Sequence, residues 1–240
     1  MKIYYSSDLC DILNSGGEYM DFIKAIQGIK LPEISQEDMM KVLDTCYQQA
    51  INGIPGSKTC EQLAEEYTNR YDSLENAARQ FISWQVAKCG TSGFLTGLGG
   101  LITLPVAIPA NIASVLYVQM RMIGTLAIMG GYNLNDDEVQ TLVYMCLVES
   151  SIADICKQTG IRVANQITVS MLKKLPGTVL TKINQKVGFR LVTKFGQKGA
   201  VNLVKMVPLA GGLVGGGIDI FEANQIADRS YKLFIEKKID

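Results

Sequence analysis

The residues that could do catalytic chemistry are few, because the chain of 240 residues contains no histidine. This excludes Ser-His-Asp triads, Cys-His dyads, HExxH zinc sites and histidine proton shuttles. A hydrolase would have to use a Ser/Lys arrangement or paired carboxylates, for example Ser150 or Ser151 with Glu149 or Asp154. Side chains of these types are equally typical of a polar helix surface. We therefore assign no catalytic residue and favour a protein that is not an enzyme.

Metal and cofactor motifs are also weak. The six cysteines show no CxxC spacing, and no imidazole could complete a zinc site with them. Asp136, Asp137 and Glu138 could hold a metal, but three acids at a helix start usually interact with the helix dipole. The glycine-rich run 93–100 lacks the Lys-Ser/Thr pair that closes a phosphate loop. We expect no metal and no cofactor, and the thiols are typical of a reducing, cytoplasmic setting.

Charge is strongly segregated along this chain, although 23 basic and 23 acidic residues cancel. Residues 155–218 contain 10 basic residues and no acidic one. Five of these cations recur at every fourth position, which places them on a slanting stripe of one helix: Lys182, Lys186, Arg190, Lys194 and Lys198. A parallel apolar row completes an amphipathic helix: Val179, Ile183, Val187, Leu191 and Phe195.

Three interpretations of this helix remain open. The first is a solvated basic face whose apolar row packs into the core. The second is an interfacial helix that meets anionic lipid headgroups. Nucleic acid is the third and is not expected, because aromatic residues are sparse, with only Phe189 and Phe195, and no recognition motif is present.

Two uncharged, glycine- and proline-containing stretches favour a membrane-related interpretation over nucleic acid. Residues 89–120 carry no formal charge, which exceeds the roughly 20 residues of a membrane-spanning helix. Glycines and two prolines interrupt this stretch, so we expect helical hairpins with close helix crossings. Residues 206–218 are also uncharged and contain Pro208 close to an apolar glycine run, which suggests a second, similar hairpin. Whether such hairpins insert in lipid or pack in a soluble core is left open.

Helical periodicity predicts the elements that position these residues. We expect helices over 36–51, 60–88, 105–130, 136–158, 160–175, 177–206 and 209–238, with Ser57 or Thr59 capping the second of them. No stretch shows the sustained alternation of a strand. The fold class is therefore all-α, a multi-helix bundle with glycine- and proline-rich hairpins. A short irregular extension over 1–35 precedes a single helical domain over 36–240.

Several of these motifs resemble the EcsC protein family. The resemblance spans roughly residues 40–236 and rests on Ile54-Pro55-Gly56, the central run 96–105, Ile108-Pro109-Ala110-Asn111, Gln119-Met120-Arg121, Gly131-Tyr132 and the run 208–212. It implies an architectural role for these motif residues: Gly97, Gly99, Gly100, Pro105, Pro109, Gln119, Arg121, Pro208, Gly211, Gly212 and Asp219. Arg121 is the sole charge between Lys88 and Asp136, and we expect it to pair with Asp136, Glu149 or Asp154.

The resemblance also implies a bacterial protein related to one encoded beside an ABC transporter. It transfers no catalytic residue. The leading hypothesis is a non-enzymatic, cytoplasmic protein, peripherally associated with an anionic membrane surface or a membrane protein. The alternative is a soluble adaptor bundle that binds a transporter subunit through its basic stripe.

Overall fold

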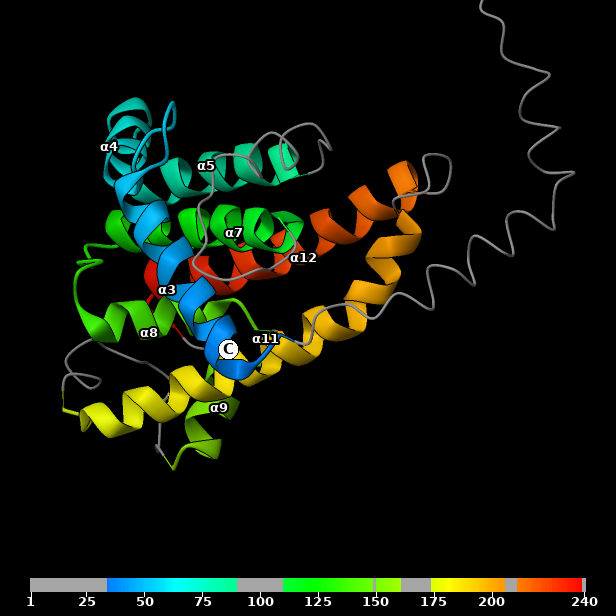
Figure 1. Ribbon diagram of the computed structural model, residues 1–240. Helices are drawn as coiled ribbons and strands as arrows, with labels where there is room; N and C mark the ends of the chain where they lie inside the picture. Colours follow the sequence, from blue (N-terminus) through cyan, green and yellow to red (C-terminus); the bar gives the residue numbers. More distant parts are fainter. Residues whose placement is uncertain (1–33, 90–109, 149, 161–173, 206–210, 239–240) are drawn as a thin grey trace, which may run out of the picture.

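The regular structure of this chain is helical throughout the part that the computed structural model describes. The described residues are 34–89, 110–148, 150–160, 174–205 and 211–238. Their helices are labelled in Figure 1: α3 (Gln36–Asn52), α4 (Cys60–Arg70), α5 (Leu74–Cys89), α7 (Ala110–Met129), α8 (Asp137–Cys146), α9 (Ile152–Gln158), α11 (Gly177–Lys205) and α12 (Gly211–Phe234). The prediction of an all-α multi-helix bundle is confirmed.

Side-chain caps explain why several helices begin where they do. The Ser35 hydroxyl accepts a hydrogen bond from the backbone N–H of Asp38 and so caps α3. At the start of α4, Thr59 and Gln62 form a reciprocal capping box, in which each side chain accepts from the other residue's backbone N–H. Thr59 is thus the cap of this helix. Ser57 instead bonds within the preceding turn, to the backbone of Ile54.

Two predicted helices are each divided in the structure. The stretch 60–88 forms α4 and α5, because Tyr71 ends the first helix and the Ser73 hydroxyl accepts from the N–H of Asn76 at the start of the second. The stretch 136–158 forms α8 and α9. The periodicity of apolar residues continued through both breaks, so it could not reveal them.

Arg229 on α12 stabilises the break after α8. Its guanidinium donates to the carbonyl of Cys146 at 2.7 Å and to that of Val148 at 2.5 Å. The last carbonyls of a helix lack intrahelical partners and carry its negative dipole end. A buried arginine from another helix therefore satisfies the end of α8, and no local sequence signal encodes that contact.

Helix α7 is the centre of the bundle (Figure 1). It packs against α3, α4, α5, α8 and α12. Ile112–Met129 is long and apolar enough to cross a membrane, but 89% of this stretch is buried inside the protein. Its apolar character is explained by its place in the core. The preceding glycine- and proline-rich residues, 90–109, lie outside the described residues.

Two glycines allow close helix contacts. A Cβ atom at Gly130, directly after α7, would collide with the backbone carbonyl of Phe234 at the end of α12. A Cβ at Gly188 on α11 would lie 2.8 Å from Sδ of Met40 on α3. These two contacts connect the central helix and the long helix α11 to their neighbours at short range.

Candidate functional site

The buried face of α11 agrees with the predicted apolar row. Ile183, Val187 and Leu191 are fully buried, Phe195 is nearly so, and Val179 is half-buried against the core. They pack where α11 meets α3, α8 and α12. The orientation of α11 is thereby fixed, which decides where each predicted cation lies.

The structure separates the five predicted cations into different environments. Lys182 and Lys186 are exposed on the outer face of α11. Arg190 is half-buried, and its Nη2 donates to Oε1 of Gln158 on α9 at 3.0 Å. The backbone of Lys198 belongs to α11, but its side chain lies outside the described part of the structure.

Lys194 corrects the prediction of a continuous basic stripe. Its ammonium lies 2.5 Å from a carboxylate oxygen of Glu222 on α12, and the two side chains are only 10% and 13% exposed. Glu222 also accepts a hydrogen bond from Nε2 of Gln119 on α7 at 3.3 Å. A four-residue step drifts by about 40° around a helix, so the stripe rotates into the interhelical contact at this point. Lys194 therefore joins α11 to α12 and is not part of an anion-binding face.

Phe189 is an exposed residue to which sequence reasoning gave no role beyond counting it among the sparse aromatic residues of this helix. Its side chain is 59% exposed, and it lies three residues after Lys186 and seven after Lys182. At about 100° per residue, these three positions fall within about 60° of one another on α11. The spacing was visible in the sequence, but only the burial of the opposite row shows that the ring faces outward.

Arg121 has a different partner from the one expected. It is only 8% exposed, and its Nη2 donates to the backbone carbonyl of Lys58 at 2.8 Å. Among the described residues, Arg121 forms no ion pair with the expected partners Asp136 and Asp154. The third expected partner, Glu149, lies outside the described residues. The buried Nε of Arg121 has no hydrogen-bond partner. The charge thus points to the turn between α3 and α4, not to the next helix.

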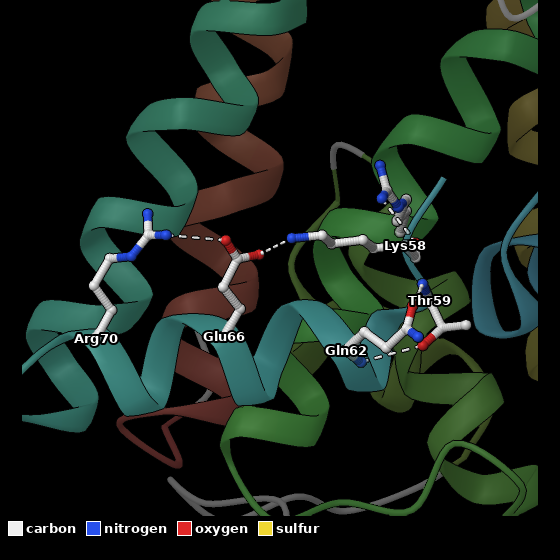
Figure 2. A network of polar contacts seen from close by, with 6 residues as sticks. Lys58, Thr59, Gln62, Glu66 and Arg70 are labelled. Atoms are coloured by element: carbon white, nitrogen blue, oxygen red, sulfur yellow. Dashed lines mark hydrogen bonds and ion pairs between the residues drawn. The ribbon is translucent and has the colours of Figure 1, made fainter. Parts of the chain in front are cut away.

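The turn that Arg121 holds carries the Ile54-Pro55-Gly56 motif. The hydroxyl of Tyr117, one helical turn before Arg121, lies 3.2 Å from that of Ser57. Figure 2 shows the outer side of this turn, where Glu66 pairs with Lys58 at 2.8 Å and with Arg70 at 3.1 Å. The two sequence motifs therefore meet, and α7 fixes the turn that leads into α4.

The other motif residues are placed only in part. Gly97, Gly99, Gly100, Pro105, Pro109 and Pro208 lie outside the described residues. Helix α12 contains Gly211, Gly212 and Asp219, but what surrounds these three residues lies outside the described part of the structure. Gln119 is 5% exposed and contacts Glu222, as noted above.

Two of the acidic and hydroxyl candidates for chemistry, Ser151 and Asp136, have structural contacts. Ser151 caps α9 by accepting from the N–H of Asp154, whose side chain is exposed. Asp136 precedes α8 and accepts from the amide of Asn133. Across the described residues, no three His, Cys, Asp or Glu side chains gather in a way that could hold a metal.

Buried hydroxyls and thiols are held in their protonated forms. Burial raises the pKa of the Cys46 thiol to about 12 and that of Cys60 and Cys156 to about 11. Burial, and then the nearby charge of Asp44, also raises the pKa of Tyr144. Its hydroxyl donates to Asp44 at 2.7 Å. A nucleophile requires a lowered pKa or an adjacent base, so none of these groups is activated.

An open cleft of about 530 Å³ lies between α5 and α12. Arg79 and Tyr231 line one part of it, and the guanidinium carbon stands 4.6 Å from the centre of the tyrosine ring. Ser83, Asn224 and Asp228 add polar groups, and the other walls are mostly aliphatic. The cleft mixes both charges with apolar surface, and it selects no single ligand chemistry.

Comparison with known proteins gives one match. The family model described as the EcsC protein family matches residues 17–235. This range begins upstream of residue 40, where the recognisable motifs start. No curated protein and no solved structure matches the chain.

Proposed function

This chain belongs to the EcsC protein family, and we propose that it acts without catalysis, by peripheral association with an anionic membrane surface through the outer face of α11. The observation that carries the proposal is the exposure of Lys182 and Lys186 on one face of a helix whose opposite face is anchored in the core. Lys174, just before α11, is also exposed.

Charge complementarity supports an anionic partner. No acidic residue occurs anywhere in 155–218, and the ion pairs found among the described residues do not include Lys182 or Lys186. Each lysine near an anionic leaflet contributes on the order of 1 kcal/mol. Two exposed lysines therefore give weak, salt-sensitive attachment, which is typical of a peripheral protein.

Peripheral attachment is favoured over insertion because the helix that could span a bilayer has another role. Exposing α7 to lipid would remove it from five helices that pack against it. Its buried Arg121 would also lose the carbonyl of Lys58. Helix α11 can meet a surface without any change in the bundle.

Liposome sedimentation tests this proposal. The protein is mixed with vesicles of phosphatidylcholine alone or with added phosphatidylglycerol, at low and high salt. We expect pelleting only with the anionic vesicles at low salt. Lys182→Gln with Lys186→Gln should weaken it by about 30-fold, since about 2 kcal/mol is removed.

The matched control removes two cations from another part of the surface. Lys58→Gln with Arg70→Gln changes net charge equally at α4, which lies well away from α11 (Figure 1). This variant should bind like the unchanged protein. Equal binding to neutral vesicles, equal loss in both variants, or no binding to any vesicle would contradict the proposal. The last result would favour the adaptor function, with an acidic protein as partner.

A further inference from the structure

The proposed membrane face of α11 contains one large apolar side chain. Phe189 is 59% exposed, although burying a phenylalanine ring away from water is energetically favourable. Lys182 and Lys186 precede it on the same face, within the two preceding helical turns, and the neighbouring exposed positions on this face are Gln185 and Thr193. The hydroxyl of Thr193 donates a hydrogen bond to the carbonyl of Phe189, one turn earlier.

We propose that Phe189 is a membrane anchor, which inserts at the boundary between headgroups and acyl chains while Lys182 and Lys186 contact lipid phosphates. This inference rests on the proposed function and adds the orientation of binding: α11 lies parallel to the membrane plane. An interfacial helix of this kind combines aromatic or aliphatic side chains with flanking lysines. Lysine stems bury along the apolar region while their ammonium groups stay at the polar surface.

The arrangement fits a lipid surface better than an acidic protein. A specific protein interface usually has a contiguous apolar centre within about 1,200–2,000 Å² of buried surface. On α11 the apolar contact is a single ring between cations and polar groups. One inserted ring with two cations on the same helix face matches the layering of a bilayer, in which phosphates lie above the acyl chains.

Geometry also permits simultaneous contact. Taking Lys182 as the reference direction on the helix, Lys186 lies about 40° to one side and Phe189 about 20° to the other. The three side chains therefore share one outward face over about two turns of α11. The core-facing row around Ile183 and Val187 keeps this face directed away from the bundle.

Tryptophan fluorescence tests the anchor directly, because Trp84 is the only tryptophan in the chain. The probe variant is Trp84→Phe with Phe189→Trp in the full-length protein. We expect its emission to shift to shorter wavelength with vesicles containing phosphatidylglycerol, and lipids brominated near the headgroup end of the chain to quench it. Phosphatidylcholine vesicles should leave it unchanged.

The matched control places the probe at an exposed phenylalanine on another helix. Phe221 on α12 is 66% exposed, so Trp84→Phe with Phe221→Trp reports vesicle contact at an exposed ring of a second helix. Its emission should not change. An equal shift in both variants, or no shift at Phe189 in protein that sediments with the vesicles, would overturn the anchor. The second result leaves electrostatic attachment intact, whereas failure to sediment overturns the proposed function itself.

Removal of the ring gives an independent measurement. Phe189→Ala should weaken binding to anionic vesicles by about tenfold, and Phe189→Leu should restore most of it, because insertion depends on apolar area. The salt dependence should stay unchanged in Phe189→Ala and become shallower in the double lysine variant. If Phe189→Ala binds like the unchanged protein, the ring is not an anchor. Circular dichroism and thermal unfolding verify that both variants fold.

Discussion

Lys194 and Glu222 form a nearly buried ion pair that joins α11 to α12, with 2.5 Å between the ammonium and the carboxylate. Gln119 of α7 contacts the same carboxylate, so three helices meet at this point. The pair uses a cation that the sequence pattern assigned to a lipid-facing stripe. Its removal should therefore affect stability far more than membrane binding.

Glu222→Gln should lower the free energy of unfolding by about 3 kcal/mol, because it removes the carboxylate charge that lies 2.5 Å from the nearly buried Lys194 ammonium. The double variant Lys194→Met with Glu222→Leu should recover most of this loss, because both charges are then absent. Urea unfolding measures the difference. A loss below 1 kcal/mol in the single variant would show that water screens the pair.

The same double variant also tests whether Lys194 takes part in membrane binding. It should sediment with anionic vesicles as well as the unchanged protein does, because Lys182, Lys186 and Phe189 remain in place. If a folded double variant bound the vesicles more weakly, Lys194 would contribute to membrane binding, which contradicts its assignment to the interhelical contact.

Arg121→Met should destabilise the protein by about 1–3 kcal/mol, since the carbonyl of Lys58 loses a charged hydrogen-bond donor. The turn over 53–58 should also be cleaved faster by proteases. Arg70→Met serves as the control, because Arg70 has an exposed pair with Glu66 that is worth less than about 1 kcal/mol. Equal effects of the two substitutions would refute a special role of Arg121 in holding the turn.

Gly130→Ala should cost about 2 kcal/mol or more, because the new methyl group would overlap the backbone of Phe234 and force α7 and α12 apart. Gly177→Ala is the matched control: a Cβ there meets no atom within 4 Å, and alanine favours a helix by up to about 1 kcal/mol. In thermal unfolding experiments, only Gly130→Ala should have a lower midpoint temperature than the unchanged protein. Similar midpoints would mean that the α7–α12 contact relaxes freely.

The buried thiols should resist alkylation in the folded protein. Cys46, Cys60 and Cys156 have pKa values raised to about 12, 11 and 11, so at pH 8 their thiolate fractions are about 100-fold or more below that of an exposed thiol. A Cys10→Ser, Cys89→Ser background removes the two cysteines outside the described thiols. Mass spectrometry should show labelling only after unfolding. Rapid labelling of the native protein would show frequent local opening.

The same pKa shifts predict loss of stability in alkali. A thiol with a raised pKa in the folded state contributes its full stabilisation below its unfolded pKa of about 8.5, and loses it as pH rises towards 11–12. In this range the unfolded chain releases the proton first. We expect unfolding free energy to fall above about pH 9, by up to about 1.4 kcal/mol per pH unit for each thiol. Urea titrations between pH 8 and 10.5 measure this slope, and Cys46→Ala should make it shallower.

The sequence by itself determined the helical class and the buried face of α11, and it narrowed the cap of α4 to Ser57 or Thr59. Each of these depends on spacing or on residues within one turn, which is information that a single helix contains. The division of 60–88 into α4 and α5, and of 136–158 into α8 and α9, was decided by capping serines and by Arg229 from a distant helix.

Only the tertiary structure decided which cations face solvent. Every fourth position carries a base from Lys182 to Lys198, and nothing in that regular spacing distinguishes one member from the next. The slow rotation of the row around α11 brings Lys194 to Glu222, while Lys182, Lys186 and Phe189 remain outside. A charge in one helix is exposed or neutralised according to what a second helix places beside it. For Lys194 that partner, Glu222, lies beyond 27 intervening residues of chain, so packing decides the outcome.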